Sequence, residues 1–345
     1  MKRTFVRHTV FAIAGLAAVG VLTALVSPYW QFELTRAICM LCAAAGLTVL
    51  IGLSGQISAG QGAFIAVGAY TTALLLNSER SSLVLALVTS AATAGGVGML
   101  VGLVCTRLRR HYLAGATLAL ALALPSLTNL GPLRPVLQAE NGLSVPIGPL
   151  PAVFGTSIPV AQWQAWVAGA SATVVLWLLA NLSASRYGRI LRAVRDDEAA
   201  AALSGIRVAR VRLIAFVVSA VCGGLAGGLL AWVTSLAAPG AFTLILSLML
   251  IAAVVIGGLG SLMGAIWGSL LLVLVPIWVS NFSVALELPV RVENNLPNGV
   301  FGVILTIMII IFPAGIQGGL AKACRRAGPR MLSLMTFRRA RGSDE

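Results

Sequence analysis

The sequence predicts an all-α membrane protein: a polytopic transmembrane helical bundle of about ten spans, with broken or re-entrant segments. Hydrophobic residues make up 59% of the 345 residues and charged residues 10%, and the mean hydropathy is +0.97. These values exclude a soluble globular domain. Apolar runs of about 17 to 25 residues recur, which is the length a helix needs to cross a bilayer. The alternating pattern of a membrane β-barrel is absent, so helices are the expected spanning elements.

The apolar runs give the expected spans in order. They are residues 9–27, 37–53, 57–76, 83–104, 112–130, 162–182, 213–233, 244–258, 265–280 and 298–315. The first run also fits a signal peptide, but it is longer than a usual signal core and lacks a clear cleavage site, so we expect a retained helix. Two stretches between spans, residues 125–161 and 281–297, contain proline and glycine, and we expect surface loops or short helices there.

The basic residues lie between the apolar runs and not on one folded surface. Twenty of the 24 Lys and Arg form four clusters: Lys2, Arg3 and Arg7; Arg107, Arg109 and Arg110; seven Arg from Arg186 to Arg212; and seven residues from Lys322 to Arg341. Positive residues concentrate in cytoplasmic loops. We therefore expect a multi-pass protein of the inner membrane with both termini cytoplasmic. The net charge of +14 then predicts contact with the lipid bilayer and no nucleic-acid binding.

The cysteine and histidine residues do not indicate a metal centre or a catalytic set. Cys39 and Cys42 form a C-x-x-C pair, but no second pair or histidine cluster accompanies it. A cysteine in an apolar helix usually packs as a small hydrophobic residue. His8 and His111 stand apart, so we expect no metal site, and a membrane-embedded enzyme is disfavoured.

Two glycine-rich polar stretches interrupt the apolar pattern, at residues 55–62 and 257–264. Irregular backbone at membrane depth survives only where protein or water covers it, and such breaks mark substrate paths in transporters. The alternative is close helix packing, because small residues let helix backbones approach. If the stretches line a path, its candidate residues are Gly55, Gln56, Ser58, Gly60, Gln61, Gly257, Gly258, Gly260, Ser261 and Gly264.

A charged segment, residues 183–212, contains a short predicted helix. Asp196 and Asp197 suit a helix N-terminus, and the alanines at 199–202 favour helix. Gly205 suits the left-handed position after the helix, followed by Ile206 as the apolar partner of a Schellman ending. The segment is either a solvated connector or a rigid helix that enters a groove on a partner protein.

The sequence resembles the LivM-type permease subunits of ATP-binding-cassette importers for branched-chain amino acids, the LivH/LivM permease family. The stretches that carry the resemblance are GLSGQISAGQGAFIAVGAY, RLRRHYLAGATLALA, GRILRAVRDDEAAAALSGI, VVIGGLGSLMGAIWG and IIIFPAGIQGGL. They occur in the family's order and cover about residues 36–320.

The resemblance implies an importer made of two permease subunits, two cytoplasmic ATPases and an extracytoplasmic binding protein. This chain would be one permease: a transmembrane domain, residues 1–320, with a coupling loop at 183–212, and a basic cytoplasmic tail, 321–345. The implied ATPase-coupling residues are Arg195, Glu198, Ala199, Ala200, Gly205 and Ile206. The chain has no G-x-x-x-x-G-K-[ST] motif, so we expect no cofactor on this chain and expect ATP and Mg²⁺ on the partner ATPases.

Departures from the family pattern leave other substrates open. Arg110 and His111 replace the usual glycine and an apolar residue, Ala265 replaces a proline, and residues 138–140 read Gln-Ala-Glu before Asn-Gly-Leu. The alternatives are a permease for urea or short amides and, less favoured, a sugar permease of the wider superfamily. An ion-coupled secondary transporter would keep ionisable groups inside its spans. The expected spans are almost free of charge, with Arg36 near a span end.

Overall fold

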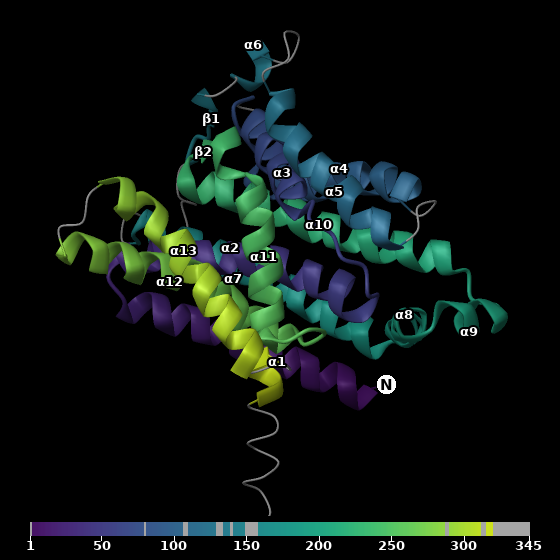
Figure 1. Cartoon of the computed structure of the whole chain (residues 1–345). Helices are drawn as coiled ribbons and strands as arrows, with labels where there is room; N and C mark the ends of the chain where they lie inside the picture. The colour runs from purple at the N-terminus through teal and green to yellow at the C-terminus, as the bar shows by residue number, and fades with distance from the viewer. Residues whose placement is uncertain are drawn as a thin grey trace, which may run out of the picture.

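The computed structural model describes residues 2–78, 81–105, 110–128, 134–138, 141–148, 158–286, 290–311 and 315–319. Helices dominate these residues, as predicted (Figure 1). The helices are α1 Lys2–Leu25, α2 Pro28–Leu47, α3 Gln61–Leu76, α4 Leu83–Cys105, α5 Arg110–Leu127, α6 Arg134–Leu137, α7 Val160–Ala184, α8 Arg186–Asp196, α9 Glu198–Leu203, α10 Val208–Thr234, α11 Leu244–Gly257, α12 Leu262–Ala285 and α13 Val290–Ile311. A π-helix, Thr48–Leu53, extends α2, and a 3-10 turn covers Pro239–Ala241. The strands are β1 Leu143–Ser144 and β2 Leu236–Ala237, paired antiparallel.

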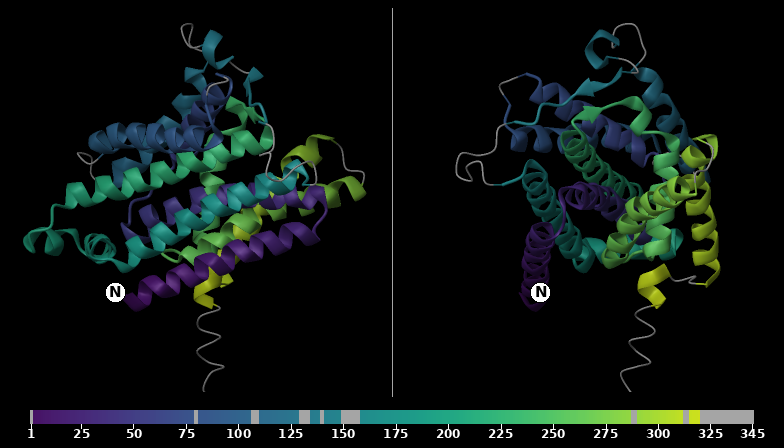
Figure 2. Two further views of the ribbon diagram at one scale, coloured as in Figure 1. Left: turned by 180° about the vertical axis from the view of Figure 1, so that it is seen from behind. Right: turned by 90° about the vertical axis from the view of Figure 1, so that its left-hand side faces the viewer.

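The bundle is organised around α10 and α2. Helix α10 packs against α2, α3 and α4, while α2 also packs against α7 and α12. Helices α11, α12 and α13 pack on one another beside α2, and α1 packs on α7 (Figure 2). The core of α2 is made of small side chains, including Cys39, Cys42 and Ala43 at 0% exposure, which lets the neighbouring helices approach closely.

Seven helices among the described residues are long and apolar enough to cross a membrane. Two further apolar helices, Gln61–Leu76 and Ala114–Ala123, are shorter, and the last predicted run lies in α13 and the residues after it. The all-α polytopic bundle is therefore confirmed, whereas ten as the number of spans stays a prediction.

Several predicted boundaries were wrong because helices extend into the expected loops. The second span begins at Pro28, where a proline is well tolerated in the first helical turn. Its Glu33 carboxylate accepts from Arg36 Nη1 at 2.9 Å one turn later, so both charges are accommodated. Helix α12 continues to Ala285, and Pro297 lies inside α13, since prolines are tolerated in membrane helices. Between 125 and 161 the described residues do include the expected short elements, α6 and β1.

The two ends of α10 define the two ends of the bundle. Its start follows α9, and its end leads into β2, which pairs with β1. At the α9 end, His8 Nδ1 lies 3.0 Å from Asn181 Oδ1, and Gly102 of α4 lies against Phe216 of α10. The helix ends that adjoin the basic clusters at residues 2–7, 107–110 and 186–212 therefore lie at the same end of the bundle. We call it the basic end. The fourth cluster and the predicted tail, residues 321–345, lie outside the described residues.

Candidate functional site

Helix α9 is capped at its N-terminus by a local side chain. Asp197 has extended backbone and accepts hydrogen bonds from the backbone N of Ala199 and Ala200 at 2.8 and 3.0 Å. This satisfies two of the donors that a helix start leaves without a partner. Glu198 follows in the first turn, where the helix dipole favours negative charge.

The C-terminus of α9 has the predicted Schellman ending. Gly205 has φ of +81°, and its N–H donates to the Ala202 carbonyl at 3.0 Å, while Ile206 N donates to the Ala201 carbonyl at 3.1 Å. This pair of bonds defines the motif, and the left-handed position favours glycine. The predicted helix and its ending are confirmed, and the helix is 6 residues long.

Sequence reasoning missed α8, the helix that precedes α9. Ser185 caps it by accepting from Tyr187 N and Gly188 N at 3.1 and 3.4 Å. Its buried residues are Gly188, Leu191 and Val194, a three-residue spacing that forms one face of a helix. The serine cap and this spacing are the sequence signals that predict α8.

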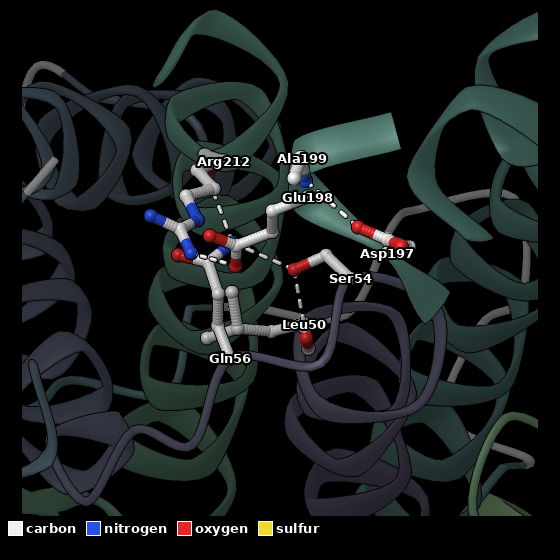
Figure 3. Close-up of polar contacts among 7 residues, drawn as sticks. All are labelled: Leu50, Ser54, Gln56, Asp197, Glu198, Ala199 and Arg212. Carbon is white, nitrogen blue, oxygen red and sulfur yellow. Dashed lines mark hydrogen bonds and ion pairs between the residues drawn. The ribbon is translucent and has the colours of Figure 1, made fainter. Parts of the chain in front are cut away.

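Side chains of α8 and α9 bond to the end of the α2 span. Arg195 Nη1 donates to the Gly52 carbonyl at 2.6 Å, and Glu198 forms an ion pair with Arg212 at the start of α10. Gln56 Nε2 donates to the Arg212 carbonyl at 3.2 Å and to Ser54 Oγ at 2.6 Å (Figure 3). The predicted coupling residue Arg195 therefore contacts the end of the α2 span, and Glu198 is linked to Gln56 of the first polar stretch through Arg212.

The first polar stretch re-enters the bundle. The chain is helical from Pro28 to Leu53, a full membrane span, and α3 begins only at Gln61. Yet Gln61 Nε2 donates to the Ala43 carbonyl at 3.4 Å, and Ala43 precedes Leu53 by ten residues, about 15 Å of helix axis. The non-helical residues between therefore run from the basic end back to mid-depth, and α3 continues from there.

In this single chain, protein covers the polar groups of the first stretch. Gln56, Ser58 and Gln61 are 4%, 0% and 0% exposed. Gln61 Nε2 also donates to the Ser219 carbonyl at 3.1 Å, and Ser219 Oγ donates to Gln61 Oε1 at 3.1 Å. A backbone N–H at the start of α3 is also bonded, because Gly62 N donates to Ser247 Oγ at 2.9 Å. Covered backbone of this kind is the form that membrane depth permits.

The second polar stretch is a tight turn between α11 and α12. Gly258 and Gly260 have φ of +120° and +81°, and Ser261 Oγ accepts from Gly264 N at 3.3 Å to cap α12. A Cβ on Gly257 would overlap the Gly264 backbone, so these two glycines pack the helices together. Glycine packing, one of the two readings open from sequence, is thus present here.

The end of the α2 span, just before the first stretch, meets the second stretch at the basic end. A Cβ on Gly52 would overlap the backbone N and Cα of Gly260, and a Cβ on Gly315 would overlap the Gly258 backbone. Residue Gly55 reverses the chain after the π-helix with φ of +70°. No sequence pattern pairs residues this far apart.

The exposed face of α9 is small and apolar. Ala199 and Ala200 are exposed, Ile206 is partly buried, and Leu203 is 90% exposed. Sequence reasoning named the alanines but not Leu203. The sequence signal for Leu203 was its place in the last turn of the predicted helix. The structure shows that Ala201 of the same helix faces inward.

The described residues contain no group of three or more His, Cys, Asp or Glu side chains placed to hold a metal ion. Cys39, Cys42 and Cys222 are buried free thiols.

Known proteins similar to the chain are membrane transport components. Residues 29–313 match the family described as branched-chain amino acid transport system / permease component. The chain is 30% identical over 296 residues to the high-affinity branched-chain amino acid transport system permease protein LivM of Escherichia coli (strain K12) and to that of Salmonella typhimurium, covering 79% of this chain and 66% of each relative. It is 28% identical over 173 residues to LivH of Escherichia coli (strain K12), covering 48% of this chain and 50% of LivH. The chain thus spans just under two thirds of the LivM relatives. No solved structure matches it.

Proposed function

The chain belongs to the family of branched-chain amino acid transport system permease components, and on that premise we propose that it is one permease subunit of an ATP-driven importer. It forms the membrane pathway for branched-chain or related amino acids delivered by an extracytoplasmic binding protein. A second permease subunit and two cytoplasmic ATPases complete the assembly, and ATP and Mg²⁺ bind to those ATPases.

The observation that carries this proposal is α9. It is a short helix, capped at both ends, with Ala199, Ala200 and Leu203 exposed, and Glu198 and the neighbouring Arg195 anchor it to the bundle. A rigid helix with small side chains enters a groove of a partner in the helix-in-groove mode. Helix α9 lies at the basic end, which the positive-inside rule assigns to the cytoplasmic side.

The path follows from the re-entrant stretch. Gln56, Ser58 and Gln61 offer neutral polar groups between the basic end and mid-depth, which let a zwitterion pass without the tight binding that a fixed charge causes. Because these groups are covered in the single chain, the described arrangement corresponds to a closed path. Movement of the helices that cover Gln61, α2 and α10, opens it.

Uptake by the reconstituted complex tests the function. The chain, co-expressed with a candidate second permease, ATPases and a binding protein, is expected to purify with ATPase subunits and to take up radiolabelled leucine with ATP and binding protein. Competition by urea distinguishes the amide alternative. Uptake driven by an ion gradient without ATPases contradicts the proposal.

The proposed orientation places both termini in the cytoplasm. In a background lacking native cysteines, Glu140→Cys is expected to react with an impermeant thiol reagent from outside, and Ala200→Cys only after permeabilisation. Equal labelling of both positions from one side contradicts this topology.

A further inference from the structure

We propose that Arg195 and Glu198 act as positioning residues that lock the coupling helices to the re-entrant stretch, so that displacement of α8 and α9 moves the path itself. The contacts involved are Arg195 with Gly52, Glu198 with Arg212 and Arg212 with Gln56, and we call them the clamp. This inference rests on the proposed function.

The first contact of the clamp binds a helix end. Gly52 lies in the last turn of the π-helix Thr48–Leu53, where carbonyls run out of intrahelical partners and the helix dipole is negative. The Arg195 guanidinium donates to the Gly52 carbonyl at 2.6 Å, from the last turn of α8. A cation on a carbonyl at a helix C-terminus is a favourable, directional contact. It fixes the end of α8 to the end of the α2 span.

The second part of the clamp joins the start of α9 to the residues that begin the re-entrant stretch. Glu198 pairs with Arg212, whose side chain is only 14% exposed. The backbone carbonyl of the same Arg212 accepts from Gln56 Nε2 at 3.2 Å, and Gln56 also donates to Ser54 Oγ at 2.6 Å. Ser54 Oγ in turn donates to the Leu50 carbonyl at 2.9 Å. Gln56 therefore holds this segment to α10, Ser54 holds it to the π-helix, and Glu198 of α9 is linked to it through Arg212 (Figure 3).

The clamp reaches the second polar stretch through backbone contact. Gly52 lies so close to Gly260 that a Cβ on Gly52 would overlap the Gly260 backbone. A Cβ on Gly315 would likewise overlap the Gly258 backbone. Close-packed backbone with no intervening side chain has no flexible atoms to absorb a displacement. A shift of Gly52 therefore moves the turn between α11 and α12 as well.

The clamp predicts a specific failure when it is cut. An α9 that still docks on the ATPase but no longer holds residues 52–56 lets ATP hydrolysis proceed without moving the path. The defect then appears as uptake lost per ATP hydrolysed and not as loss of assembly. A merely structural role for Arg195 would lower assembled complex and leave this ratio unchanged.

The experiment measures leucine uptake and ATP hydrolysis by the same reconstituted full complex. Arg195→Met removes the donors to Gly52 and keeps the aliphatic length, and Arg189→Met, at an exposed arginine of the same helix, is the matched control. Uptake per ATP in Arg195→Met is expected to fall at least about fivefold, the lower range of coupling between sites. Arg195→Lys, which keeps one cationic donor, is expected to restore part of the ratio.

The second arm exchanges the charges of the ion pair. Glu198→Arg and Arg212→Glu are each expected to lower uptake per ATP, and the double variant is expected to recover it, because the exchanged pair restores the contact. Recovery separates pairing with Arg212 from a contact of Glu198 with the ATPase. The exchanged pair also tests the clamp if the Arg195→Met complex fails to assemble.

The outcomes separate the clamp from the proposed function. A wild-type complex without ATP-driven uptake would overturn both. A coupled wild type with the same uptake per ATP in Arg195→Met and Arg189→Met, or with no recovery in the exchanged pair, would overturn the clamp alone. Loss of the ratio with recovery in the exchanged pair supports it.

Discussion

The two polar stretches look alike in sequence and differ in what holds them. Residues 55–62 are held by side chains: Gln56 and Gln61 bond to α10, and Ala59 N donates to Thr117 Oγ1 at 3.0 Å. Residues 257–264 are held mainly by backbone packing of glycines. The first runs to mid-depth, whereas the second turns at the end of two helices. A glycine-rich interruption of an apolar run therefore has two structural meanings, and the polar side chains beside the glycines distinguish them.

Packing between the stretches is expected to be the most sensitive point. Gly52→Ala places a Cβ on the Gly260 backbone, where no flexible side chain can yield, and we expect a loss of about 3 kcal/mol of folding free energy. Gly96→Ala is the control, since nothing lies within 4 Å of a Cβ there. Thermal unfolding in detergent measures both variants. Equal melting temperatures for the two would contradict the close backbone contact.

The next largest loss of folding free energy is expected at the polar side chains of the first stretch. Gln61→Leu strands the Ser219 hydroxyl and the carbonyls that Gln61 binds, and we expect a loss of about 1 to 2 kcal/mol. If the stretch lines the path, uptake per assembled complex also falls in Gln61→Leu, Gln56→Leu and Gln56→Glu. Insertion of the two leucine variants is intact because leucine inserts more easily. Wild-type uptake per assembled complex in all three would place the path elsewhere and leave only the packing role.

Two substitutions of Gly205, at the end of α9, distinguish an effect on folding from an effect on docking. Gly205 has φ of +81° and nothing within 4 Å of a Cβ, so Gly205→Ala and Gly205→Leu should cost the same backbone strain, about 1 kcal/mol. Only leucine adds bulk on the docking side. We expect substrate-stimulated ATP hydrolysis to be reduced in the Ala variant and lost in the Leu variant. Similar hydrolysis in both would argue against a close-fitting groove at this position.

The smallest expected effect on stability is at Leu203. Its side chain is 90% exposed, so Leu203→Ser should change the unfolding free energy of the isolated chain by no more than an ordinary surface substitution does, about 0.5 kcal/mol. We expect weaker retention of the ATPase on purification, because a buried apolar anchor is lost from the interface. Leu178→Ser, at a leucine of α7 that is 53% exposed, controls for loss of an exposed leucine. Equal ATPase retention in the two variants would show that Leu203 is no anchor.

The local structure of α9 could be predicted from the sequence because its causes are local. Asp197 caps donors two and three residues away, and Gly205 meets a steric demand of its own backbone. The clamp could not be read in the same way. Arg195 and Gly52 are 143 positions apart, and the seven arginines of the loop offered no means of choosing one.

The sequence by itself determined that this chain is an all-α membrane protein, because the need to satisfy backbone groups in hydrocarbon acts on each apolar run separately. The tertiary structure decided which apolar helices lie inside the bundle and which lie at its surface. Helices α1 and α2 are neighbours of similar apolarity, yet 6% of the first apolar window and 83% of the second are buried inside the protein. Hydropathy cannot separate the two, because lipid and protein interior are equally apolar. Packing through small residues such as Cys42 and Ala43 placed α2 at the centre and brought its end against the second polar stretch.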